Sequence, residues 1–172
     1  MRCRKRQRDA ATTDRGAPWL PSPSFGQGAL RRTFDKSGSM AVGFGTSPNG
    51  SWSSVDRTDW SGFYDDALQG HLLNYFTVDG VSVDPYDGAT FCGPQLDTLI
   101  TRLQMAAQSI ATQPPEWPFA DEEQRTRYFE SCRQYQIDLL QPRDQALRIL
   151  REAIALATKA RNRNEFLTFC GD

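Results

Sequence analysis

Few side chains in this 172-residue chain have the types and spacing that chemistry requires. Carboxylates occur as adjacent pairs at Asp65-Asp66 and at Glu122-Glu123. General acid–base catalysis needs two groups positioned on the same reacting atoms, whereas neighbouring residues on a helix point in different directions. The pairs therefore predict a solvated face and a helix start, and we predict that the protein is not an enzyme.

His71 is the single histidine of the chain, and histidine is the residue type that most often acts as a general base. A serine or cysteine nucleophile beside it would form the pair used in covalent catalysis, but the chain has no G-x-S-x-G turn to hold one. Because His71 precedes Leu72-Leu73, we interpret it as a partly buried structural histidine. A small hydrolase or transferase using His71 is kept as an alternative function.

The spacing of the metal-ligating residue types predicts no metal site and no cofactor. Cys3, Cys92, Cys132 and Cys170 form no C-x-x-C pair, so we expect buried free thiols and a reducing compartment. The carboxylates at 79, 84 and 87 do not have calcium-loop spacing, and a proline lies between them. Gly43-Phe44-Gly45 lacks the third glycine of a dinucleotide-binding loop.

Charge and composition divide the chain into two parts. Residues 1–39 carry nine basic and three acidic residues, a net charge of +6, and residues 40–172 carry eleven and eighteen, a net charge of −7. The first part has frequent prolines and glycines without apolar periodicity, so we predict a disordered basic extension, or a mis-assigned start upstream of Met40. Residues 40–172 are predicted to be a single domain, too acidic to bind nucleic acid. No stretch is apolar enough to span a membrane.

The second half of the domain has helical periodicity. Apolar residues recur at helical spacing over 94–112, over 121–140 and again from 142 onward. Pro94 and Pro142 suit first-turn positions, and Asn164 suits a left-handed cap. In the second helix the predicted buried stripe is Tyr128, Cys132, Tyr135 and Leu139. Residues 165–170 then alternate and predict a final strand.

The first half predicts a loop and a hairpin. Residues 41–62 are rich in glycine and serine, and Trp52 and Trp60 are expected to anchor this loop to the core. Residues 72–83 are rich in strand formers around the turn signal Asp79-Gly80. A terminal strand must pair with something, and we expect that hairpin to be its partner. The predicted fold class is α+β: three amphipathic helices packed on a small antiparallel sheet that the C-terminal strand completes.

A compact run between the two halves contains Asp84-Pro85-Tyr86-Asp87 and then Phe91. Pro85 favours a turn, and Asp87 can accept a hydrogen bond from its own downstream backbone. We expect Tyr86 and Phe91 to pack beneath the first helix, so the run is interpreted as a structural motif.

Together with Gln95-Leu96 and the terminal run 166–172, which ends in Gly-Asp, this motif resembles a loose group of small bacterial proteins. Most of them are uncharacterised, and some are of the immunity type encoded beside secreted toxins. The resemblance covers roughly residues 72–172. It implies a cytoplasmic binding protein, and no catalytic residues carry over from the group.

An acidic segment with aromatic residues is the predicted partner-binding surface. Aromatic residues surrounded by charges are typical of protein interfaces, and carboxylates would attract a basic partner such as a nuclease toxin. An ordinary solubilising surface is the competing interpretation. A structural or regulatory homo-oligomer is a further alternative, and the oligomeric state is left open. The candidate residues are Asp56, Asp59, Trp60, Tyr64, Asp65 and Asp66.

Overall fold

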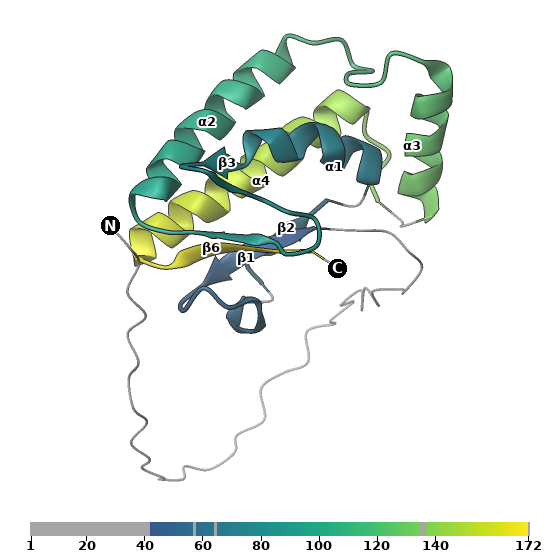
Figure 1. Cartoon of the computed structure of the whole chain (residues 1–172). Helices are drawn as coiled ribbons and strands as arrows, with labels where there is room; N and C mark the ends of the chain where they lie inside the picture. The colour runs from purple at the N-terminus through teal and green to yellow at the C-terminus, as the bar shows by residue number, and fades with distance from the viewer. Residues whose placement is uncertain (1–41, 57, 64, 135–136, 172) are drawn as a thin grey trace, which may run out of the picture. The chain divides into compact units, whose positions relative to one another are not determined.

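Four helices and a four-stranded antiparallel sheet make up the folded part of the chain (Figure 1). The computed structural model describes residues 42–56, 58–63, 65–134 and 137–171, and the extension predicted for residues 1–39 lies outside them. The helices are α1 (Asp66–Leu72), α2 (Pro94–Ala111), α3 (Glu122–Gln134) and α4 (Pro142–Arg163), with 3-10 turns at Trp52–Ser54 and Leu73–Tyr75. The strands are β1 (Gly43–Ser47), β2 (Trp60–Gly62), β3 (Thr77–Val78), β4 (Val81–Ser82), β5 (Ala89–Phe91) and β6 (Phe166–Cys170).

The C-terminal strand β6 lies inside the sheet, whose strand order is β2-β1-β6-β5. Phe44 on β1 is opposite Phe169 on β6, and Leu167 is opposite both Thr46 and Phe91. The predicted α+β class, with a sheet completed by the C-terminus, is confirmed. The predicted partner of β6 is wrong, because β3 and β4 form a separate two-stranded hairpin.

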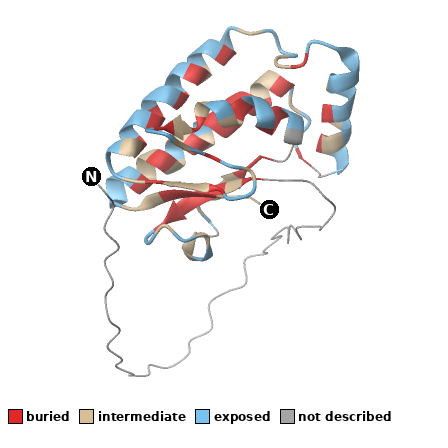
Figure 2. Cartoon of the chain, viewed as in Figure 1, coloured by how far each residue is buried: buried red, intermediate tan, exposed pale blue. Residues whose placement is uncertain are grey.

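Helix α4 crosses one face of the sheet and contacts β1, β2 and β6, while α2 packs along α4, and the inward faces of both helices are buried (Figure 2). Aromatic rings fill the space between the sheet and the helices. The Phe44 ring lies 5.3 Å from that of Phe169 and 5.7 Å from that of Phe63, measured between centroids. Phe91 and Phe76 also contact Phe169, at 5.8 Å and 5.4 Å. Offset and edge-on contacts of this kind add to the free energy of burial.

The helix boundaries follow the proline and capping signals. Pro94 and Pro142 occupy the first turns of α2 and α4, where their missing N–H groups are not needed. Asn164 caps α4 in the left-handed conformation, with φ 53° and ψ 37°. Helix α3 is described as far as Gln134, Tyr135 lies outside the described residues, and the chain is no longer helical at Ile137, so Leu139 lies beyond the helix and is 59% exposed instead of buried.

Residues 41–62, predicted as a loop, contain the strands β1 and β2. The glycines of β1 let the side chains of Trp52 and Val55 pack closely on the outer face of the sheet. A Cβ at Gly43 would lie 2.9 Å from the Trp52 ring, and one at Gly45 would lie 2.5 Å from a methyl of Val55. Trp52 is half-buried against Gly43 of β1, so it anchors this segment to the sheet and not, as expected, to the hydrophobic core. Residues 72–75, predicted as strand, instead form the end of α1 and a 3-10 turn.

Candidate functional site

The acidic segment before α1 faces a polar stripe on α4. Asp59, only 15% exposed, forms an ion pair with Lys159, and Arg163 approaches the same carboxylate at 3.7 Å. A carboxylate held between two cations in a partly buried position joins the segment before β2 to the end of α4. Asp59 is therefore occupied by contacts within the chain.

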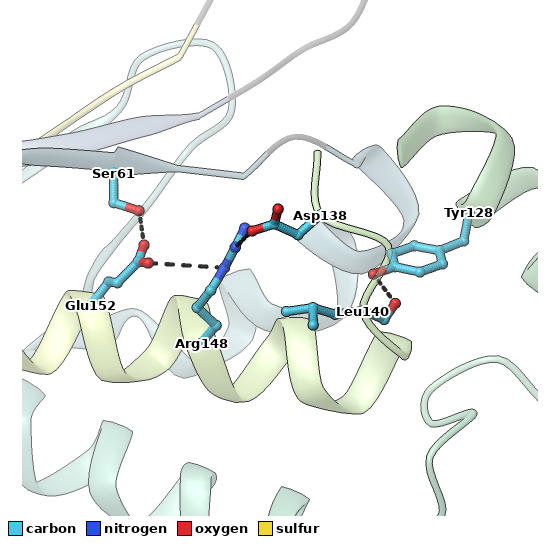
Figure 3. A network of polar contacts seen from close by, with 6 residues as sticks. All are labelled: Ser61, Tyr128, Asp138, Leu140, Arg148 and Glu152. Atoms are coloured by element: carbon cyan, nitrogen blue, oxygen red, sulfur yellow. Dashed lines mark hydrogen bonds and ion pairs between the residues drawn. The ribbon is translucent and has the colours of Figure 1, made fainter. Parts of the chain in front are cut away.

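A second group of polar contacts continues along α4 (Figure 3). The Ser61 hydroxyl donates to Glu152, whose other carboxylate oxygen lies 3.9 Å from Nε of Arg148. Arg148 donates to Asp138 at 2.7 Å. This arrangement ties β2 and the segment after α3 to α4.

The remaining residues of the predicted surface divide into engaged and exposed groups. Asp65 caps α1, accepting a hydrogen bond from the Leu68 N–H at 2.8 Å. Asp56 is exposed, and its hydrogen bonds from the Thr58 N–H and hydroxyl lower the pKa of its carboxyl.

Three further residues complete that surface. Trp60 is half-buried on β2. Tyr64 and the side chain of Asp66 lie outside the described residues, although Asp66 begins α1. The structure therefore leaves Asp56 as the predicted carboxylate that is described and exposed.

A buried polar cluster lies where α3 meets α1 and α4. The Tyr128 hydroxyl donates to the Leu140 carbonyl at 3.1 Å, and burial raises the pKa of this hydroxyl above its usual range. Burial likewise raises the pKa of the Cys132 thiol, partly offset by a hydrogen bond with Tyr128. A thiol kept protonated is a poor nucleophile, so Cys132 is a structural residue, as predicted.

His71 lies at the exposed end of α1, and the prediction that it is partly buried is wrong. Its ring is 6.0 Å from that of Phe119 and 6.4 Å from that of Trp117. Within the described part of the chain, the imidazole ring packs near these two aromatic rings. They hold the imidazole against the segment that precedes α3.

The Asp84–Gly88 turn presents an exposed aromatic residue. Tyr86 is 66% exposed, so the expectation that it packs beneath the first helix is wrong, whereas Phe91 is fully buried as expected. Asp84, and not Asp87, forms the Asx turn: one of its carboxylate oxygens accepts from the Tyr86 N–H at 2.7 Å and the Asp87 N–H at 3.2 Å. Asp84 and Asp87 are both exposed beside Tyr86.

This turn rests directly on the end of β6. A Cβ at Gly171 would lie 1.6 Å from the Pro85 carbonyl oxygen, and one at Gly88 would lie 2.2 Å from the Phe169 carbonyl oxygen. Gly88 also has φ +69°, a conformation that L-residues rarely adopt. The two segments that carry the resemblance, far apart in sequence, are thus in backbone contact. Sequence reasoning interpreted the motif as structural and missed the exposure of Tyr86, because no local signal distinguishes a buried tyrosine from an exposed one.

Cys132 and Cys170 form no disulfide; the side chain of Cys132 is buried and that of Cys170 is half-buried. Among the residues that the structure describes, no three histidine, cysteine or acidic side chains gather as metal ligands would. Nor does any described helix combine the length and apolar character needed to cross a membrane.

Comparisons of this chain with protein-family models, with characterised proteins and with solved structures find no match.

Proposed function

We propose that this domain is a non-catalytic binding protein of the immunity type, which neutralises a basic partner protein by covering its functional surface. One observation carries the proposal: Tyr86 is 66% exposed, at the tip of a turn with two exposed carboxylates. Tyrosine is among the residues that contribute most to protein interfaces. The carboxylates of Asp84 and Asp87 beside it favour a partner surface rich in lysine and arginine.

The turn that presents Tyr86 is fixed before any partner arrives. Asp84 and Gly88 exchange two backbone hydrogen bonds, of 2.7 Å and 3.3 Å, and the Asp84 side chain holds the two N–H groups between them. The glycine contacts with the end of β6 restrict it further. A preorganised loop loses little conformational entropy on binding, so more of the contact energy contributes to affinity.

Charge supports the same partner chemistry. The net charge of −7 on residues 40–172 would attract a basic protein over a distance of about one Debye length, roughly 8 Å at physiological salt. Asp56 adds an exposed carboxylate outside the turn, as predicted for the acidic segment. Asp59 and Asp65 support the fold, so charge reversal at Asp65 would disturb the start of α1 as well as any interface.

The groups that could act as catalysts also favour a binding role. The Ser61 hydroxyl and the Glu152 carboxylate bind each other, and the Cys132 thiol is buried and held protonated. No observation favours the His71 hydrolase or the homo-oligomer over binding, and both stay as predictions.

The compartment is a separate part of the proposal. We place the protein in the cytoplasm, where a reducing environment keeps cysteine side chains as thiols. Alkylating thiols in intact source cells before lysis, followed by mass spectrometry, would show the state of Cys92. A reduced Cys92 agrees with the cytoplasm, and an oxidised one indicates an oxidising compartment.

The binding proposal is tested with matched surface variants. The immobilised full chain is first used to isolate a basic protein from the source cell's secreted fraction. Binding of that protein is then measured for Tyr86→Ala and for Met105→Ala. Met105 is also 66% exposed, but it lies on α2. We expect Tyr86→Ala to weaken binding at least tenfold, since a central interface tyrosine contributes about 2 kcal/mol or more, and Met105→Ala to change it less than twofold. Equal binding by the two variants, or capture of no basic protein, would refute the proposal.

A further inference from the structure

Gln145 carries a buried oxygen that no group in the described part of the protein satisfies. The residue is 3% exposed on α4, and its Oε1 accepts no hydrogen bond. Buried polar atoms in folded proteins are almost always hydrogen-bonded to protein or to ordered water. An unpaired amide oxygen at this depth therefore points to a bound molecule that can donate a hydrogen bond.

Gln145 lines a small cavity of about 10 Å³ between the start of α1, α3 and α4. This volume is at the lower limit for a single water molecule and excludes anything larger. Asp65, Tyr128 and Cys132 also line the cavity, with apolar side chains completing it. The lining is mostly apolar, and the few polar atoms in it are enough to hold one water, which needs two to four partners.

We propose that this cavity is a binding site for one structural water, which donates a hydrogen bond to Oε1 of Gln145. The second O–H of the water can donate to either of two acceptors. The Tyr128 hydroxyl donates to Leu140 and is hydrogen-bonded with Cys132, which still leaves one lone pair of its oxygen for the cavity, and the Asp65 carboxylate lines the cavity as another acceptor. A buried water commonly makes about three such bonds.

The position of the site gives the water a structural role. In α3 the fully buried side chains are Tyr128 and Cys132, and both line this cavity. The rest of the helix is largely exposed (Figure 2). A water bonded to Gln145 on one side and to Tyr128 or Asp65 on the other would join α4 to α3 or to the start of α1. The bound water therefore strengthens the contact of the exposed helix with the body of the domain.

A high-resolution crystal structure of the full chain tests the site directly. We expect one isolated density peak 2.7–3.2 Å from Oε1 of Gln145 and at a similar distance from Tyr128 or Asp65. An empty cavity, or a Gln145 amide turned to place its Oε1 against a protein donor, would overturn the proposal.

Thermal unfolding provides an independent measurement. Gln145→Leu removes the acceptor at similar volume, and Gln108→Leu makes the same chemical change on the exposed face of α2. If water is bound, Gln145→Leu lowers Tm by about 3 °C or more, since the water loses a partner, while Gln108→Leu leaves Tm nearly unchanged. A rise in Tm for Gln145→Leu would show that the cavity is dry. An ammonium ion offers the same donors, and a Tm higher in ammonium chloride than in equimolar sodium chloride would replace water by that cation.

Discussion

Replacing Gly88 with alanine, compared with the same change at Gly80, separates two reasons for a glycine: a positive φ, and a close backbone contact that leaves no room for a Cβ. Both residues have a positive φ, +69° at Gly88 and +78° at Gly80, so both variants incur the conformational cost of an L-residue, about 1–2 kcal/mol. Nothing lies within 4 Å of a Cβ at Gly80. A Cβ at Gly88 would lie 2.2 Å from the carbonyl oxygen of Phe169 and 3.2 Å from Cα of Cys170. The difference between the two variants therefore measures the contact of the turn with β6.

The size of this difference in unfolding free energy depends on which atoms must move to make room for the new methyl group. Backbone atoms of β6 obstruct the new methyl, and β6 is paired with β1 on one side and β5 on the other. Overpacking at a site that cannot yield costs about 1–3 kcal/mol, so Gly88→Ala should lose about 2–5 kcal/mol in all and Gly80→Ala about 1–2 kcal/mol.

Urea unfolding followed by circular dichroism measures both variants. With an m-value of about 2 kcal/mol/M, an extra loss of 2 kcal/mol lowers the midpoint of Gly88→Ala by about 1 M relative to Gly80→Ala. Equal midpoints would refute the reasoning, because they would mean that the turn can move away from the end of β6 at no cost. Unequal m-values would show instead that the denatured state or the cooperativity had changed.

Three further predictions concern the polar groups. The pKa values of Cys132 and Tyr128 are raised above their ordinary 9.0 and 10.0, so the stability that depends on their protonated forms is complete below pH 9 and is lost as pH rises beyond 9 to 10. Urea midpoints should therefore fall as pH rises through that range, and they should fall less steeply in a Tyr128→Phe variant. An identical slope in the two proteins would contradict the argument that burial raises these pKa values. Asp59→Ala should cost about 1.5–3 kcal/mol in urea unfolding, while Asp56→Ala, at an exposed position, should not shift the midpoint measurably; the reverse order would contradict the assignment of Asp59 to the fold. Ser61→Ala should lower stability by about 1 kcal/mol without changing partner binding, and a loss of binding at constant stability would place Ser61 in the interface.

The helices could be predicted from the sequence because their signals are local. Pro94, Pro142 and Asn164 mark helix ends through their own backbone preferences, and apolar residues repeat within a few positions of one another. The sheet could not be predicted in the same way. Gly43-Phe44-Gly45 has the composition of a loop, and it becomes the strand β1 only because β6 and β2 pair with it from distant positions.

The candidate site shows the same limit. Asp59 was predicted to be part of an exposed acidic surface, and nothing within its segment indicates otherwise. Its partner Lys159 is 100 residues away, and the pairing exists because α4 crosses the sheet next to β2. The one available signal was on α4, where charged residues recur at helical spacing at 148, 152, 159 and 163 on a helix whose other face is apolar. Such a stripe predicts a solvated face when read alone, and a contact surface only when an oppositely charged segment is known to lie beside it.

In the Asp84–Gly88 turn, the constrained residues fix the backbone and do not bury the aromatic side chain of Tyr86. A motif whose purpose is to bury an aromatic residue needs a pocket around that residue, yet the pocket here receives Phe91, and Tyr86 stays outside. The features that the turn does require concern its backbone: the Asp84 carboxylate that accepts two N–H groups, Gly88 with its positive φ, and Gly171, where any side chain would collide with the Pro85 carbonyl. These constraints fix the path of the chain on both sides of Tyr86 without covering it. Three constrained positions thus fix the backbone around an exposed tyrosine without burying it, and on this observation we propose the turn as the partner-binding surface.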